Sequence, residues 1–260
     1  MTRFATQSRP GHKHTVNEDT TGNLAKSGLW LIADGMGGEA AGEIASDLVC
    51  STILEEARSG AALPEAVASA HRAVASAAAQ DAGKTGMGST VVAVRLGGDQ
   101  MEVAWVGDSR CYLWREGKLH LITRDHSLVQ HLVDTGQITE AEAATHPERN
   151  VVTQVLGVGD PQPDTAQLSL QANDWLLLCS DGLNDVLTDA EIRTVLADSA
   201  DPSYAAQHLV ERVADAQGPD DVTVTVVHND PRSGNPWLAA SIGVVFGLLV
   251  FAIAIWTDAL

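Results

Sequence analysis

Several aspartates of this sequence stand where an apolar run meets a glycine or a turn. They are Asp34 after residues 29–33, Asp108 after 101–107, Asp181 after 174–180, and Asp220 and Asp221 before 222–227. An unpaired carboxylate at the edge of an apolar core is costly to bury, so these side chains must be solvated or paired. Any one of them can be an ordinary turn residue, because Asp-Gly is a common turn dipeptide. As a set they favour a chemical role.

The chemistry that fits such a set is that of hard divalent cations. Carboxylates that meet at one sheet edge repel one another, and Mn²⁺ or Mg²⁺ removes the repulsion by taking oxygen ligands in octahedral geometry. Two such ions a few Å apart can share a hydroxide and clamp a phosphoryl group from both sides. The chain has no Cys-x5-Arg run, so the carboxylates, and not a thiol nucleophile, are the candidate reactive groups.

Hydrophobic periodicity predicts the elements that must position these groups. The alanine-rich stretches 40–58 and 63–82 carry apolar residues at helical spacing and predict two helices. Short runs rich in β-branched or aromatic residues, bounded by glycine or charged turns, predict strands. These runs are 29–33, 89–96, 101–106, 110–115, 174–180 and 221–227.

The order of these elements favours mostly antiparallel sheets. Within residues 101–121, three predicted strands are separated by turns at Gly107-Asp108 and Glu116-Gly117, which predicts a β-meander. We therefore expect helices on the outer faces of antiparallel sheets, rather than a doubly wound parallel sheet. The polar segment 124–150 predicts a helix-loop insertion that forms a flap over a site.

Residues 237–256 contain no charged side chain. At about 1.5 Å per residue this stretch spans roughly 30 Å, the thickness of a bilayer's hydrocarbon core. Trp237 and Trp256 stand at its ends, where headgroups favour such rings. We expect a transmembrane helix, with a buried core helix or an apolar tail that packs on the domain as the alternatives. Its Gly243 and Gly247 form a GxxxG spacing that would support weak dimerisation.

Charge and composition indicate which classes of partner are unsuitable and where the protein is located in the cell. With 34 acidic against 16 basic residues the formal net charge is −18, which argues against nucleic acid as a partner. The N-terminus lacks a signal-peptide pattern, and Arg232 precedes the apolar stretch, so we expect the upstream part in the cytoplasm, anchored to the inner membrane by a single span. The three cysteines, Cys50, Cys111 and Cys179, have apolar neighbours and predict reduced core residues.

Over residues 5–228 the sequence resembles the metal-dependent protein serine/threonine phosphatases (the PPM family, type 2C). Its motifs occur in order along the chain. They are VNED (16–19), ADGMGG (33–38), GMGST (86–90), VGDSR (106–110), TRDHS (123–127), His146-Pro147 through Asn150, Leu156-Gly157, SDGL (180–183) with Asp185, and DDVT (220–223).

The resemblance implies an α+β fold, a two-layer antiparallel β-sandwich flanked by helix pairs, within residues 1–228. Residues 229–236 would be a linker, 237–256 the transmembrane helix and 257–260 a short tail. The implied activity is hydrolysis of phosphoserine and phosphothreonine by a hydroxide that bridges two Mn²⁺ or Mg²⁺ ions. Phosphorylated proteins, and a cognate Ser/Thr kinase of bacterial type, would be its partners.

Site residues carry over by matching position. The implied catalytic metal ligands are Asp34, which would bridge both ions, the Gly35 carbonyl on one ion, and Asp181 and Asp220 on the other. Metal-bound waters would be held by Glu18 and Asp19. A third ion would take Asp108 and Asp181, with Asp185 as a further candidate.

Three positions depart from the family pattern. His14 stands where a phosphate-binding arginine is usual, which makes His14, Lys13 and Arg9 the candidates for holding the substrate phosphate. Met36 stands where animal members have a histidine, and Asp221 replaces the usual asparagine. The last change adds a carboxylate that would tighten metal binding or face solvent. Because of His14, the alternative function is a catalytically weakened phosphatase-like protein that binds a phosphorylated partner.

Overall fold

The computed structural model describes residues 2–13, 15–37, 41–80 and 86–230. Two antiparallel sheets pack face to face, and every strand pairing among the named strands is antiparallel. The first sheet has the order β1 (Thr2–Arg9), β11 (Val222–Asn229), β10 (Trp175–Cys179), β7 (Arg110–Arg115) and β8 (Lys118–Leu121). The second has the order β2 (Asp19–Leu24), β3 (Leu29–Met36), β5 (Val91–Gly97), β6 (Gln100–Val106) and β9 (Asp164–Ser169), with the short β4 (Gly88–Ser89) paired to β3.

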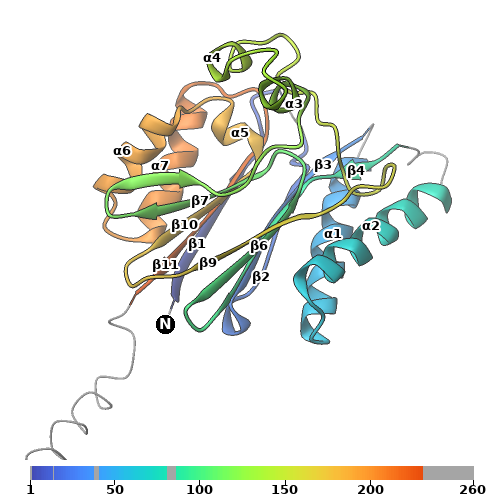
Figure 1. Ribbon diagram of the computed structural model, residues 1–260, viewed down its shortest axis with the longest axis horizontal. Helices are drawn as coiled ribbons and strands as arrows, with labels where there is room; N and C mark the ends of the chain where they lie inside the picture. The colour runs from blue at the N-terminus through green and yellow to red at the C-terminus, as the bar shows by residue number, and fades with distance from the viewer. Residues whose placement is uncertain (1, 14, 38–40, 81–85, 231–260) are drawn as a thin grey trace, which may run out of the picture.

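Helices cover the outer face of each sheet. The second sheet is covered by α1 (Ala41–Arg58) and α2 (Leu63–Gln80), and the first by α5 (Asp181–Asn184), α6 (Asp189–Asp198) and α7 (Pro202–Asp215). Figure 1 shows the two helix groups on opposite sides of the sandwich, with α3 (Leu128–Asp134) and α4 (Glu140–Ala143) at its upper end. The expected α-β-β-α layering is confirmed.

Alternation along the central strands explains why they are apolar throughout. In β3, Leu29 and Leu31 pack under α1 and α2, whereas Trp30 and Ile32 pack between the sheets. Both faces of such a strand are buried, so neither needs polar residues. The same alternation occurs in β5 and β10, which made these strands visible in the sequence.

The strands that sequence reasoning missed are β1, β2 and β9. All three lie at sheet edges, and their sequences, TRFATQSR, DTTGNL and DTAQLS, are largely polar. An edge strand with a half-exposed face does not need an apolar run, so the hydrophobic pattern carries little signal there.

The predicted β-meander is wrong at its first turn. β6 pairs with β5 and β9 in the second sheet, and β7 pairs with β10 and β8 in the first. The Gly107-Asp108 turn therefore passes the chain from one sheet to the other, and only β7 and β8 form a hairpin. Gly107 has φ of 103°, a conformation that favours glycine. Periodicity detects strands but not the sheet to which each belongs.

Several other predictions concern single segments. Residues 124–150 do form a helix-loop segment, with α3 and α4 inside it. The three cysteines are free and buried, as expected. Within the described ranges, no helix has the length and apolar character needed to cross a membrane. The predicted transmembrane helix 237–256, the tail and most of the linker lie outside the described residues.

Candidate metal centre

Two of the predicted carboxylates meet because β2 and β3 pair. Their register places Asp19 directly opposite Asp34, so both side chains lie on one face of the sheet. Asp34 is fixed by its backbone: its N–H donates to Oγ1 of Thr90 at 3.2 Å, and its carbonyl accepts the Thr90 N–H at 2.8 Å. Like charges directly opposite one another destabilise a sheet, so this pair requires a cation or a proton.

The first sheet supplies a second pair at its own edge. β10 and β11 are antiparallel, with Cys179 opposite Val224, so the end of β10 lies beside the start of β11. Asp181 follows β10 at the first position of α5, and Asp220 lies just before β11. Both side chains are partly exposed. They therefore lie at the margin of the sandwich core, and Asp181 lines the same hollow as Asp108.

Glycines let the backbone segments around these carboxylates come close together. A Cβ on Gly35 would collide with the carbonyl oxygen of Gly42, and one on Gly182 would collide with the carbonyl oxygen of Asp221. A Cβ on Gly42 would meet the carboxyl group of Glu18. The Glu18 carboxylate thus lies at the N-terminus of α1, where the helix dipole favours negative charge. The glycine of each Asp-Gly motif is required by this close packing.

Burial and mutual repulsion raise the carboxyl pKa values. The pKa of Asp34 lies well above its ordinary value because of desolvation, reinforced by Asp19 and Asp181. Desolvation likewise raises the pKa of Asp181, with repulsion from Asp108 and Asp220 next in size. Desolvation also raises the pKa of Asp19 and that of Asp108 to about 7. The carboxylates that repel one another in this way form one electrostatic group, which we call the carboxylate cluster. Its members are Asp19, Asp34, Asp108, Asp181 and Asp220.

The carboxylate cluster fits a hard divalent ion. Asp19 Oδ1 and Asp181 Oδ1 are buried without a hydrogen-bond partner, and a buried orphan oxygen is costly unless a donor or cation reaches it. In the part of the chain that the structure describes, no group of three or more His, Cys, Asp or Glu side chains is placed so that it could hold a metal ion by itself. Backbone carbonyl oxygens and water would therefore have to complete the coordination shell of an ion bound here, as Mg²⁺ commonly allows.

The candidates for a third ion lie under the flap. Asp185 Oδ2 accepts a hydrogen bond from Asn150 Nδ2 at 2.8 Å and lies 3.9 Å from a guanidinium nitrogen of Arg149. Asp185 and Asp108 line a common hollow of about 560 Å³ between the flap and the sandwich. Asp185 therefore joins the segment after α4 to the edge of the carboxylate cluster.

Asp221 does not face solvent, which is one of the two roles expected from the sequence. Its side chain is buried, Oδ1 accepts the Gly11 N–H at 2.8 Å, and Oδ2 accepts the Glu18 N–H at 2.7 Å. The His12 N–H also donates to the Gly218 carbonyl at 2.9 Å. Two acceptor oxygens therefore hold both ends of the loop between β1 and β2. An asparagine would offer only one acceptor there.

The phosphate-binding candidates belong to this same loop region. Arg9 is the last residue of β1 and pairs with Val222. Val222 follows Asp220 by two residues along the chain, and Lys13 lies in the loop after β1. Arg9 and Lys13 are both exposed, so both have side chains available to an anion. His14 lies outside the described residues.

The structure also reveals a supporting residue that sequence reasoning did not single out. Ser180 Oγ donates to Asp19 Oδ2 at 2.7 Å and accepts the Thr223 N–H at 3.0 Å. Ser180 follows β10 of the first sheet, whereas Asp19 begins β2 of the second. This hydroxyl therefore connects the two sheets at the metal-binding edge. Its only sequence signal was its place before Asp181.

A second group of missed residues holds the turn that carries Asp108. Arg110 pairs with Asp125 through contacts of 2.6 to 3.1 Å. The N–H of Gly107 donates to His126 Nδ1 at 3.2 Å, and the His126 N–H donates to the Gly107 carbonyl at 2.9 Å. The segment entering the flap is thereby fixed against the turn between the sheets.

Comparisons with known proteins agree with this geometry. The profile of the family described as Protein phosphatase 2C matches residues 8–216. The chain therefore belongs to the protein phosphatase 2C family, and the resemblance inferred from the motifs is confirmed.

Individual relatives include the serine/threonine protein phosphatase PstP of Mycobacterium tuberculosis, 37% identical over 249 residues that cover 92% of this chain. The present chain spans about half of that relative, 48% of its length. The serine/threonine phosphatase stp of Listeria innocua is 33% identical over 228 residues, covering 82% of this chain and 90% of that protein. The crystal structure of the PstP catalytic domain in complex with two manganese ions matches with a TM-score of 0.80 and 34% identity, over 87% of this chain and 97% of that one.

The raised pKa values predict how the stability of the metal-free protein depends on pH. The folded-state pKa values of Asp19 and Asp108 are about 7, against about 3.9 in an unfolded chain. The folded state thus binds more protons between these values, and stability falls as the pH rises from about 4 to about 7. Mn²⁺ offsets the repulsion that then develops. We expect Mn²⁺ to raise Tm more at pH 8 than at pH 5 in thermal unfolding, and an equal rise at both would contradict the assignment.

The two hydrogen bonds of Asp221 predict a specific cost for restoring asparagine. Asp221→Asn removes one acceptor and turns an amide group toward a backbone N–H. We expect a loss of about 1–3 kcal/mol in the free energy of unfolding, measured with urea. The matched control is Asp215→Asn at the exposed end of α7, which should change stability by less than about 0.5 kcal/mol. Equal stability of the two variants would show that the Asp221 contacts contribute nothing.

Proposed function

We propose that this chain is a metal-dependent protein serine/threonine phosphatase that uses two Mn²⁺ or Mg²⁺ ions. The observation that carries the proposal is the carboxylate cluster, five aspartates that come together at one end of the sandwich, where Asp19 Oδ1 and Asp181 Oδ1 are buried without a hydrogen-bond partner. Relatives that match most of the chain are named serine/threonine phosphatases, and a related catalytic domain binds two manganese ions. Phosphorylated serine and threonine side chains of proteins are the proposed substrates.

The proposed roles of the residues follow from their positions. Asp34 and the Gly35 carbonyl, together with Asp181 and Asp220, would hold the two ions, and Glu18 and Asp19 would orient water. When bound, the ions supply Lewis acidity and an activated water for attack on phosphorus. The protein's own part is to keep these oxygens in place, which the Thr90 bonds to Asp34 and the Ser180 bond to Asp19 accomplish.

Charge at the rim governs substrate binding. A phosphate group brings negative charge to a site already rich in carboxylates, so a cation of the protein must help to hold it. Arg9 and Lys13 are exposed beside the site, and His14 is the remaining candidate. Arg9 is best suited, because a guanidinium can bind phosphate with two parallel hydrogen bonds.

A thiol mechanism does not fit the same geometry. Cys50, Cys111 and Cys179 are all buried, and desolvation raises the pKa of the Cys111 thiol to about 12 and raises those of Cys50 and Cys179 further. Thiolates are the reactive form of cysteine. These residues would stay protonated and out of reach of a phosphoprotein.

Substitution of the metal-binding aspartates tests the proposal. With Mn²⁺ present, the native chain should hydrolyse p-nitrophenyl phosphate and a phosphothreonine peptide. Asp34→Asn and Asp181→Asn should each lower turnover at least about a hundredfold, because even residues that only support ligands cost about 10–100-fold when changed. Asp215→Asn is the matched control and should retain full activity.

The same experiment separates the two functions considered. A native chain that binds Mn²⁺ and a phosphothreonine peptide but releases no phosphate would support the phosphatase-like binding protein instead. Retention of more than a few per cent of the native rate in both aspartate variants would overturn the assignment of the metal centre.

For location, we propose a single-pass anchor at residues 237–256 that holds the phosphatase domain on the cytoplasmic side of the inner membrane. The support is the uncharged stretch of 20 residues with a tryptophan at each end. Weak dimerisation through Gly243 and Gly247, and a Ser/Thr kinase as the opposing enzyme, are part of the same proposal.

Cell fractionation tests the anchor. The full chain should pellet with membranes and resist high-salt extraction, since burial of about 20 apolar residues is insensitive to ionic strength. A variant truncated after residue 236 should stay in the supernatant. Release of the full chain by salt would mean that the segment does not span the bilayer.

A further inference from the structure

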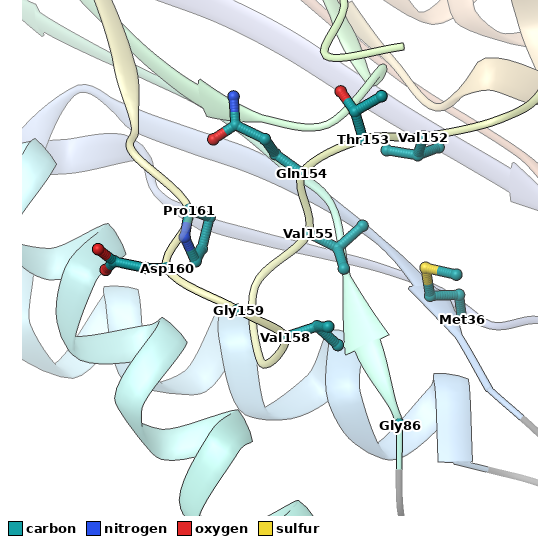
Figure 2. Close-up of a pocket in the computed structure, with 10 residues that line it drawn as sticks. All are labelled: Met36, Gly86, Val152, Thr153, Gln154, Val155, Val158, Gly159, Asp160 and Pro161. Carbon is teal, nitrogen blue, oxygen red and sulfur yellow. The ribbon is translucent and has the colours of Figure 1, made fainter. Parts of the chain in front are cut away.

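A hollow of about 420 Å³ lies beside the metal-binding end of β3. Its apolar wall consists of Met36, Val152, Val155, Val158 and Pro161. In Figure 2 the side chains of Val155 and Val158 project from their loop on the side of Met36, whereas the carboxylate of Asp160 points the opposite way. We call this hollow the Met36 pocket.

The Met36 pocket is tied to the strand that carries Asp34. Ser89 pairs with Gly35 in the β3–β4 ladder. Ser89 also exchanges two backbone hydrogen bonds with Leu156, at 2.8 and 3.1 Å. The loop wall and the metal-binding strand therefore share β4 as a common support.

The far side of the loop is fixed to α2. The Gly157 N–H donates to His71 Nδ1 at 3.0 Å. Gly157 has φ of 96°, and a Cβ there would collide with Val74. The loop is thereby held against the helix, so the pocket is largely formed before any ligand arrives, as small-molecule and side-chain sites usually are.

Large apolar side chains of the pocket face water. Met36 is 45% exposed and Val158 47% exposed, although both stand over the buried Val155 and Pro161. Burial of such surface contributes about 25 cal/mol per Å². Among the residues that the structure describes, no cation lines the pocket, and a carboxylate entering it would approach the acidic cluster. An uncharged apolar side chain is therefore the favoured occupant.

We propose that the Met36 pocket binds an apolar side chain of the phosphoprotein substrate, two positions away from the phosphorylated residue. The proposal rests on the phosphatase function proposed above. Asp34 and Met36 lie two residues apart on one strand, on the same face and about 6–7 Å apart. An extended substrate has the same spacing between alternate side chains. When the phosphate of an extended substrate is held at the carboxylate cluster, the substrate side chain two residues from the phosphorylated residue would therefore lie over Met36.

Paired phosphothreonine peptides test the pocket. In the first pair, one peptide has Leu and the other Asn at position +2. In the second pair, the same difference stands at position −2. The kcat/KM of each peptide is measured with Mn²⁺ present. At one of the two positions the native chain should prefer Leu roughly tenfold. Val158→Glu should raise KM for that Leu peptide and bring the preference close to one, because it places a carboxylate at the exposed rim.

Controls separate this proposal from the proposed function. Hydrolysis of p-nitrophenyl phosphate, which has no residue two positions from its phosphate, should be the same in Val158→Glu and the native chain. Tyr204→Glu changes an apolar residue of similar exposure, 44%, on α7 and should leave the Leu preference intact. Val158→Ser, a milder change, should reduce the preference in part.

The outcomes are distinct. Absence of aryl phosphate hydrolysis by the native chain would refute the phosphatase function itself. Normal aryl phosphate hydrolysis with equal rates for Leu and Asn peptides would overturn only the pocket. So would a Leu preference that survives Val158→Glu.

Discussion

The concentration of carboxylates at one end of the sandwich is the constraint on which the remaining structure depends. Asp19 and Asp34 face each other across β2 and β3, and Asp181 and Asp220 approach from the other sheet. Removing these groups from water while they repel one another opposes folding. The raised pKa values are the direct expression of that cost. Bound divalent cations would turn the same arrangement into a favourable one, so ion binding and folding are coupled.

Much of the surrounding sequence serves to hold this unfavourable arrangement together. Gly35 and Gly182 allow close backbone contacts that no Cβ would permit, and Gly42 leaves room for the Glu18 carboxyl group. The hydrogen bond from Ser180 to Asp19 joins the two sheets. The carboxylate of Asp221 holds the loop that precedes Asp19. Each device acts within a few Å of the cluster. A large apolar core, in three layers, provides the stability against which this local cost is set.

The site also explains how one end of the molecule can combine different kinds of recognition. The carboxylates and their ions would deal with the phosphoryl group, which is common to all substrates. The flap is joined to Asp185 through Asn150, and the Met36 pocket begins at the end of β3, two residues after Asp34. In the proposed function, the strands of the sandwich would hold the metal-binding groups, while loops, which vary more easily, would select the substrate.

The sequence by itself determined the central strands, both long helices and the family, and it singled out the aspartates of the candidate site, because apolar alternation and Asp-Gly motifs are local patterns. It could not detect the polar edge strands β1, β2 and β9, since an exposed edge needs no hydrophobic run. Only the tertiary structure decided that the Gly107-Asp108 turn changes sheets, that Ser180 bonds to Asp19, and that Asp221 holds a backbone loop. These facts depend on contacts between residues up to 210 positions apart, and no local pattern encodes which distant groups will meet.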